Sequence, residues 1–336
     1  MLELDGSEGG GQLVRTALTL SVLSDTPFTM TGIRGGRRKP GLKPQHLAAV
    51  ETLAEISDAT VSDAELGSEK LTFEPSRLQG GHYEVDIGTA GSIPLLFDSL
   101  LPLTTQLDEL LTVRARGGTD VKWSPPMDYV RLVKLPLLRR WGLIATVDLA
   151  RRGYYPKGGG DATLTLAPSV LLPPSVIERG ELRGVRVYSV ASADLAGSDV
   201  AERQTDEATR LLEPTVGILE RSVTYSASAS AGSAVVVRLD FDQTLAGFGT
   251  LGERGKPAEA VAGDAVELAQ SWLDGPGAVD ARLADQLVVP LALCGGEVTI
   301  PMVTDHLESN VEVVRAFGYE VSIVDDPLRV AGTALC

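Results

Sequence analysis

Three histidines are the candidate nucleophiles of this chain: His46, His82 and His306. A neutral imidazole can attack phosphorus and can also accept a proton. His306 follows Asp305 at the start of a predicted helix, and His46 stands at the start of another. His82 lies in a Gly-Gly-His-Tyr segment between a loop and a strand, where we expect a surface residue. Because an isolated histidine is more often structural than catalytic, the sequence pattern leaves a structural role open for each of them.

Residues 33–43 form the most basic segment and read Ile-Arg-Gly-Gly-Arg-Arg-Lys-Pro-Gly-Leu-Lys. The glycines allow the backbone to approach an anion closely, and arginines bind phosphate oxygens in pairs. Such a cluster is unusual in a chain whose net charge is -15. We therefore expect phosphate binding here, in preference to the alternative of a solvated basic turn.

A second candidate anion site is the Glu-Gly-Gly-Gly-Gln turn at residues 8–12, which opens a predicted helix. Free N–H groups and the helix dipole favour an anion at such a position. Arg15 lies one turn into this helix and is expected to face the same pocket. Glu8 is a candidate ligand for a divalent ion, Mg²⁺ or Mn²⁺, that bridges to phosphates. The turn matches neither a Walker A loop nor a dinucleotide-binding fingerprint, so a tight structural turn is the alternative.

Asp285 and Gln286 are expected at the start of another helix, in the position that Gly11 and Gln12 hold in the first one. An aspartate at a helix start is also a candidate cap.

The composition limits the classes of function. The chain has 336 residues, 43% of them hydrophobic, and a pI of about 4.7. It lacks the overall basic footprint of most nucleic-acid-binding proteins. However, few lysines among many carboxylates suggest adaptation to high salt, where charges are screened over about 3 Å at 1 M. The acidity therefore does not exclude an RNA end as a substrate.

The chain is also expected to be cytoplasmic and to have no membrane partner. No apolar run approaches the roughly 18 to 20 residues of a membrane span, and the N-terminus does not resemble a signal peptide. Cys294 and Cys336 suggest neither a disulfide framework nor a zinc site.

The predicted elements repeat three times, which favours an α/β (α+β) fold built from three βαβαββ units. The first unit has strands at 2–4, 28–33, 59–62 and 70–73 and helices at 12–23 and 44–57. The second has strands at 83–87, 111–115, 144–149 and 162–166, and helices ending at 103 and spanning 128–141. The third is shorter and begins with a helix at 284–293, followed by a strand at 297–302, a helix at 306–317 and strands at 319–324 and 328–331.

A segment of different character separates the second and third units and is predicted to be an inserted small α/β domain. It has strands at 185–190 and 234–241, helices at 200–212 and 258–273, and a low-complexity loop at 226–233. The predicted boundaries are residues 1–180 for the first two units, 181–276 for the insertion and 277–336 for the third unit.

The chain resembles the RNA 3'-terminal phosphate cyclase family. The matching segments run in the family's order from end to end, and they are specific only in combination. They are residues 5–15, residues 33–42 with Gln45-His46-Leu47, Gly117-Gly118-Thr119-Asp120, residues 154–160, Leu283-Ala284-Asp285-Gln286 and Asp305-His306-Leu307.

The resemblance implies three repeats like the C-terminal domain of translation initiation factor three, with an inserted α/β domain. It also implies a reaction that converts an RNA 3'-phosphate to a 2',3'-cyclic phosphate at the expense of ATP, through AMP bound to a histidine. The implied roles are His306 as nucleophile and Glu8 at the metal. The implied phosphate and RNA-end contacts are Arg15, Arg34, Arg37 and Gln45. The implied nucleotide-binding residues are Gln12, Pro125, Arg282, Asp285 and Gln286.

One residue departs from the family pattern. Arg282 stands where an aromatic residue is expected before Leu-Ala-Asp-Gln, so adenine would stack on its guanidinium or on Pro125 and Pro126. Two other functions stay open. One is a cyclase-like ribosome-assembly protein without catalysis, against which the retained His306 and Glu8 argue. The other is an enolpyruvyl-transferase-type enzyme, which would need no histidine nucleophile.

Overall fold

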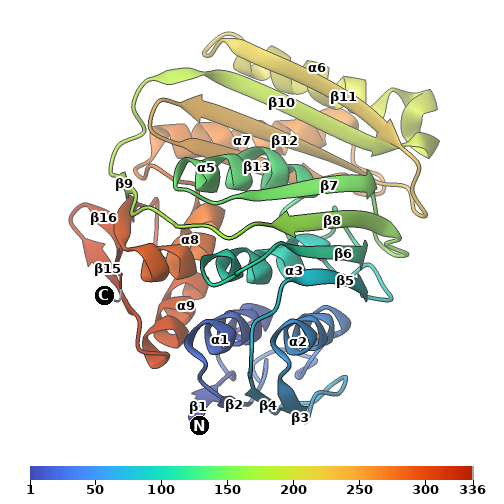
Figure 1. Cartoon of the computed structure of the whole chain (residues 1–336). Coiled ribbons are helices and arrows are strands. Elements are labelled where there is room, and N and C mark those ends of the chain that lie inside the picture. Colours follow the sequence, from blue (N-terminus) through green and yellow to red (C-terminus); the bar gives the residue numbers. More distant parts are fainter. Residues whose placement is uncertain (335–336) are drawn as a thin grey trace.

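The computed structural model describes residues 1–334, so Cys336 lies outside the described residues. It confirms the α/β class: four separate four-stranded sheets are covered by helices (Figure 1). The first unit contains strands β1 (Leu2–Asp5), β2 (Phe28–Thr31), β3 (Thr60–Ser62) and β4 (Leu71–Glu74), with helices α1 (Gly11–Ser24) and α2 (Pro44–Ser57). Both helices end at an aspartate with left-handed backbone, Asp25 and Asp58. A single residue of this kind closes a helix.

The second unit repeats this arrangement with more elaborate helices. Its strands are β5 (Gly81–Asp86), β6 (Leu111–Gly117), β7 (Ala145–Arg151) and β8 (Gly160–Leu166). Its helices are α3 (Ile93–Leu100) with the 3-10 turn Leu101–Thr105, then α4 (Met127–Tyr129), a π-helical turn Val130–Lys134 and α5 (Leu135–Arg140). The expected single helix at 128–141 is therefore divided by a π-helical turn.

The sequence suggested that the third unit begins with a helix, but in the structure a short strand far upstream belongs to it. Strand β9 (Ser175–Val176) pairs in parallel with β14 (Gly296–Thr299) and completes the third sheet. The unit continues with α8 (Ala281–Cys294), α9 (Asp305–Ala316), β15 (Glu320–Asp325) and β16 (Leu328–Thr333). With β9 included, the sheets of the three repeated units share one strand order: β1-β2-β4-β3, β5-β6-β8-β7 and β9-β14-β16-β15. In each, the first pair is parallel and the other two pairs are antiparallel.

The segment between β9 and α8 forms the fourth sheet, in the order β11-β10-β12-β13. Its elements are β10 (Leu182–Ser192), the 3-10 turn Ala193–Ser198, α6 (Val200–Leu212), β11 (Ile218–Ser226), β12 (Ser233–Phe241), β13 (Leu245–Leu251) and α7 (Ala258–Asp274). Side chains between this sheet and its two helices make a hydrophobic cluster of their own, separate from the main core. Arg179 joins the two ends of the segment, because its guanidinium donates to the carbonyls of Leu273 and Gly277.

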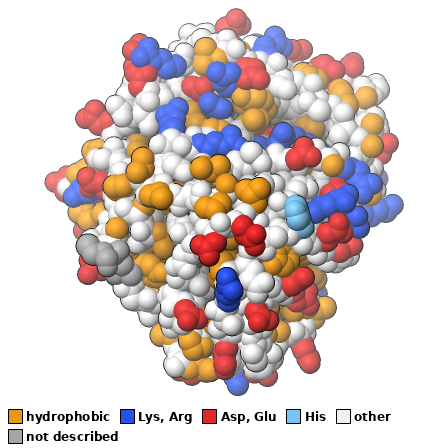
Figure 2. Space-filling view, viewed as in Figure 1, with side chains coloured by type: hydrophobic (Ala, Val, Ile, Leu, Met, Phe, Trp, Pro, Cys, Tyr) orange, Lys and Arg blue, Asp and Glu red, His pale blue; other side chains and the backbone are white. Residues whose placement is uncertain are grey.

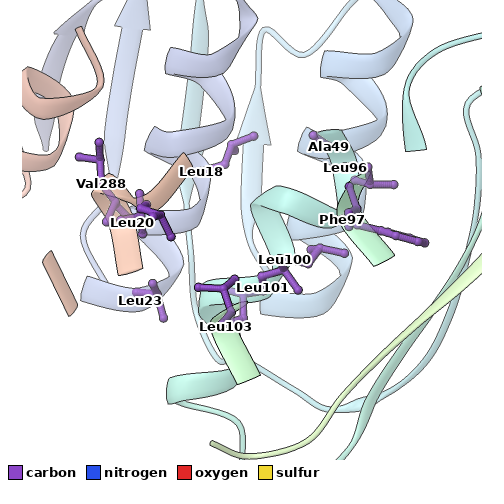
Figure 3. Close-up of a cluster of buried hydrophobic side chains, with 14 of the residues drawn as sticks. Leu18, Leu20, Leu23, Ala49, Leu96, Phe97, Leu100, Leu101, Leu103 and Val288 are labelled. Carbon is purple, nitrogen blue, oxygen red and sulfur yellow. The ribbon is translucent and has the colours of Figure 1, made fainter. Parts of the chain in front are cut away.

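Helices from all three units meet in the main core (Figure 3). Leu18, Leu20 and Leu23 of α1 lie near Leu100 of α3 and Val288 of α8. Burial of such side chains removes apolar area from water and stabilises the folded state by about 25 cal/mol per Å². The helix faces that meet here leave the N-terminal ends of α1 and α9 free to face a common cleft.

Asp280 ties three parts of the chain together. Its carboxylate caps α8 by accepting from Leu283 N at 3.0 Å. It also accepts from the Tyr129 hydroxyl of the second unit at 2.8 Å and from Gly247 N of the inserted segment at 3.1 Å. Helix α8 thus starts at Ala281, and Asp285 lies inside it rather than at its start. No helix among residues 1–334 is long and apolar enough to span a membrane.

Candidate active site

A cleft of about 2350 Å³ opens between the repeated units and the inserted segment. It brings together residues that are far apart in the sequence. All but one of the predicted site residues line it: Gln12, Arg15, Arg34, Arg37, Gln45, Pro125, Arg282, Asp285, Gln286 and His306. Glu8 is the exception. His82 is exposed on β5 and does not line the cleft.

His306 is exposed in the first turn of α9. Thr304 caps this helix by accepting from Leu307 N at 3.0 Å, and its hydroxyl donates to Asp285 Oδ1 at 2.6 Å. Asp285 therefore does not cap its own helix but fixes the cap of the next one. Burial raises the pKa of Asp285, while the Thr304 hydrogen bond opposes that shift. Through this pair, α8 determines where the imidazole of His306 stands.

Helix α1 holds α9 from the other side. Gln12 Nε2 donates to the backbone carbonyl of His306 at 2.6 Å. One turn further, the Thr16 hydroxyl donates to Asn310 Oδ1 at 2.6 Å. Asn310 Nδ2 then donates to the Asp285 carbonyl of α8 at 3.0 Å. The amide nitrogen of Gln12 is thus committed to positioning α9, which leaves its Oε1 as the polar atom available for a ligand.

The N-terminus of α1 is open to an anion. Its cap residue, Gly10, supplies no side-chain hydrogen bond, and no acidic residue lies in the first turn. A Cβ at Gly10 would lie 3.6 Å from Arg37 Nη2, so this guanidinium stands over the helix start. Uncapped N–H groups, the helix dipole and an arginine together favour a phosphate at this point.

Arg15 adds a cation to the same wall of the cleft. Burial alone lowers the pKa of Arg15 to about 10, because no carboxylate in residues 1–334 pairs with its guanidinium. A partly buried cation without a counterion is costly, and an anionic ligand would relieve that cost.

Lys134 is a cleft residue that the sequence analysis missed. It is buried, lines the cleft and forms an ion pair with Asp98. Burial, reinforced by the charge of Arg15, lowers the pKa of Lys134 to about 7. Lys134 lies at the end of the π-helical turn, and such turns are frequent at functional sites. The local sequence has no pattern that predicts a π-helical turn.

Two of the predicted phosphate contacts also organise the site. Arg34 has left-handed backbone, and its Nη1 donates to the carbonyls of Lys39 and Gly41, both at 2.9 Å. Its guanidinium therefore shapes the basic loop and keeps only its other nitrogens for a ligand. Gln45 Oε1 accepts from Ser92 N at 3.3 Å, which joins the first unit to the second.

His46 is buried behind the start of α1. Its Nδ1 accepts from Lys43 N at 3.1 Å, and a methyl group at Gly11 would overlap its ring. Burial, with the charges of Arg15 and Arg34, lowers the pKa of His46 to about 3. His46 is therefore a neutral imidazole at physiological pH. Since Nδ1 accepts, Nε2 carries the proton.

Helix α8 also contributes to the cleft two residues with polar atoms that have no partner among residues 1–334. Arg282 Nη1 and Gln286 Oε1, one turn apart on α8, are buried and unpaired among the described residues. The Arg282 guanidinium lies 5.3 Å from the Tyr129 ring centroid, and Pro125 borders the same space. A donor and an acceptor left unsatisfied in a cleft indicate a polar ligand, since such atoms are normally paired.

Glu8 is exposed beside the cleft rather than in its lining. Among residues 1–334, no three His, Cys, Asp or Glu side chains gather in a way that could hold a metal ion. This excludes an all-protein metal cage in the described chain.

Comparison with known proteins identifies the family of the chain. The family model "RNA 3'-terminal phosphate cyclase" matches residues 6–323. A protein of Halobacterium salinarum with that name is 48% identical over 331 residues, covering 95% of this chain and 96% of the relative. Proteins of the same name from Ralstonia nicotianae and Pyrococcus furiosus are 41% and 39% identical. These matches cover 94% of this chain and 91% and 93% of the two relatives. The chain therefore belongs to the RNA 3'-terminal phosphate cyclase family of enzymes.

Proposed function

We propose that the chain converts an RNA 3'-terminal phosphate to a 2',3'-cyclic phosphate, using ATP and a covalent AMP intermediate on His306. The observation that carries this proposal is the position of His306. It is an exposed imidazole in a cleft that is also lined by Arg15, which pairs with no carboxylate among residues 1–334, and by the uncapped start of the adjacent helix α1. Such a cleft suits a nucleophile that must meet a polyanionic substrate.

In the first step, a nitrogen of His306 attacks the α-phosphorus of ATP. The bond from that phosphorus to the bridging oxygen breaks, pyrophosphate leaves, and the imidazole loses its other proton to solvent. Asp285 and Thr304 contribute by holding the start of α9. Arg282, Gln286 and Pro125 would border the nucleoside. When bound, Mg²⁺ supplies charge neutralisation on the phosphates, and Glu8 is the residue proposed to contact it.

In the second step, an oxygen of the RNA 3'-phosphate attacks the phosphorus of the AMP, and the bond to His306 breaks as the imidazole regains a proton. In the third step, the 2'-hydroxyl oxygen attacks the 3'-phosphorus, loses its proton and displaces AMP. The negatively charged RNA phosphate needs cations and N–H donors to bind it. We propose Arg15, Arg37 and the α1 start as its binding groups, with Arg34 and Gln45 at the edge of the same site.

The test is adduct formation with ATP labelled at the α-phosphate. Denatured wild-type protein should retain the label and lose it in mild acid, because a phosphoramidate is labile to acid and stable to alkali. His306→Asn should retain none while folding normally. His82→Asn, which replaces an exposed histidine outside the cleft, is the matched control and should label fully. Labelling of folded His306→Asn at the wild-type level would refute the nucleophile and the mechanism built on it.

A further inference from the structure

The rim of the cleft carries two exposed aromatic side chains that serve no core. Trp123 is 95% exposed and Tyr155 is 76% exposed, and both line the cleft. Trp123 also has left-handed backbone, with φ of 62°. A bulky residue in that region costs about 1–3 kcal/mol, and Trp123 buries almost nothing in return. Folding stability therefore does not account for this residue.

The loops that present the two side chains are firmly anchored. Beside Trp123, the buried Ser124 hydroxyl lies 2.5 Å from the Ser92 hydroxyl. Asp120 lies three residues before Trp123, and Tyr154 lies directly before Tyr155. The backbones of Asp120 and Tyr154 pair in an isolated β-bridge. Asp120 also accepts from buried Arg152 at 3.1 Å. The two aromatic residues thus project from neighbouring, fixed backbones, as a preformed surface requires.

We propose that Trp123 and Tyr155 are a stacking platform for the bases at the 3' end of the RNA, an inference that rests on the proposed function. Every base has a π-face, so aromatic side chains hold single strands largely without regard to sequence. Cations line the same cleft: Arg37, Arg254 and Lys122, the last paired with Glu253 at 3.1 Å. This combination of exposed rings and cations is typical of single-strand binding.

The platform serves the RNA and not the adenine of ATP. The polar groups suited to a nucleoside, Arg282 Nη1 and Gln286 Oε1, are buried within the cleft, whereas Trp123 lies at its solvent edge. An RNA is longer than its reacting nucleotide and must leave the cleft across this edge. Adenine has no such need.

Tryptophan fluorescence gives a direct readout. The chain has three tryptophans, and the other two, Trp141 and Trp272, are only 7% and 6% exposed. Emission accessible to a soluble quencher therefore reports on Trp123. A short single-stranded RNA with a 3'-phosphate should quench it and shield it from acrylamide in wild-type protein, whereas ATP alone should not. The RNA response should vanish in Trp123→Leu.

Kinetics supply the second readout. Trp123→Leu and Tyr155→Leu should each raise KM for the RNA by about 5- to 100-fold, the loss expected for one stacked base. Trp123→Phe should restore most of the affinity, and AMP transfer to the protein should stay at the wild-type rate. Val170→Ala is the matched control, since Val170 is 80% exposed but outside the cleft lining. An RNA with abasic terminal positions should lose affinity for wild type and not for Trp123→Leu.

The outcomes separate this inference from the proposed function. Normal AMP transfer and RNA cyclisation by Trp123→Leu and Tyr155→Leu, with unchanged KM and no RNA quenching of wild type, would overturn the platform alone. Quenching by ATP would assign Trp123 to adenine and also overturn it. Absence of AMP transfer in wild type would defeat the proposed function, and RNA quenching of Trp123 would still support the platform.

Discussion

The two histidines of the cleft occupy opposite environments. His306 is exposed at the start of α9, whereas His46 is buried behind the start of α1. Both were predicted at helix starts, but in the structure the Nδ1 of His46 accepts from Lys43 N, and its ring packs against Gly11. That contact depends on the tertiary structure, so the sequence did not indicate it.

The low pKa of His46 predicts a pH-dependent stability. In the unfolded chain this imidazole takes up a proton near its usual pKa of 6.5, but in the folded protein only near 3. As pH falls from 6.5 towards 3, the unfolded state binds a proton at this imidazole that the folded state does not bind. The stabilisation that neutral His46 contributes is therefore lost at about 1.4 kcal/mol per pH unit. His46→Asn can accept from Lys43 N without titrating. Chemical denaturation at several pH values should show the advantage of wild type over this variant shrinking as pH falls.

The control for this measurement is His82→Asn, which removes an exposed imidazole from β5. An advantage of wild type over His46→Asn that stays constant between pH 7 and pH 4 would contradict the burial of a neutral imidazole.

The two arginines of the basic loop should separate stability from substrate binding. Arg34→Ala removes two charge-assisted hydrogen bonds within the loop and should lower the free energy of unfolding by about 1–3 kcal/mol. Arg37→Ala should change the free energy of unfolding by less than about 0.5 kcal/mol. It should raise KM for the RNA, because the proposed bidentate contact of Arg37 to the 3'-phosphate would be lost. Arg37→Lys should not restore that KM. Equal effects of Arg34→Ala and Arg37→Ala on both quantities would show that the loop acts only as a unit.

Several elements could be predicted from the sequence because their patterns are local. The helices at α1, α2, α6 and α7 lie within a residue or two of the ranges expected from apolar spacing. Strand β13 was missed because its glycines resemble a break. In the structure, Gly247 and Gly249 are needed where the strand crosses Tyr129 and Pro126 closely. Strand β9 has only two residues, which is too short for any periodic signal.

The cap of α9 gives a prediction about how this helix positions His306, the proposed nucleophile. Thr304→Val keeps the shape of the side chain but loses both the cap and the hydrogen bond to Asp285. Stability should fall by about 1 kcal/mol, whereas AMP transfer to His306 should slow by about 10- to 100-fold because the imidazole is misplaced. Thr304→Ser should restore both. Single-turnover labelling and urea denaturation measure the two effects. If AMP transfer falls only in proportion to the fraction of folded protein, Thr304 stabilises the helix but does not position His306.

The whole molecule carries a net charge of -15, and acidic side chains are spread over the face in Figure 2, with basic ones gathered in patches. Self-repulsion among carboxylates opposes folding and is screened by salt. We expect the thermal midpoint to rise between 0.1 and 2 M KCl. Replacing three exposed carboxylates by amides, in Glu65→Gln, Asp108→Asn and Glu312→Gln, should reduce that rise. A midpoint that falls with KCl would contradict an adaptation to high salt.

The pairing of β9 with β14 determines when the third unit can form. Ile177, next to β9, and Thr299 of β14 are hydrogen-bonded although they are 122 residues apart in the sequence. On a ribosome, the first two sheets can close as soon as their own residues emerge, but β9 must wait until the whole inserted segment and α8 have been synthesised. Closing so long a loop is slow. A fragment that starts at residue 277 would expose the edge of β14, which is open to pairing with other chains. The third unit is thus the last to be completed and the one most exposed to misassembly during synthesis.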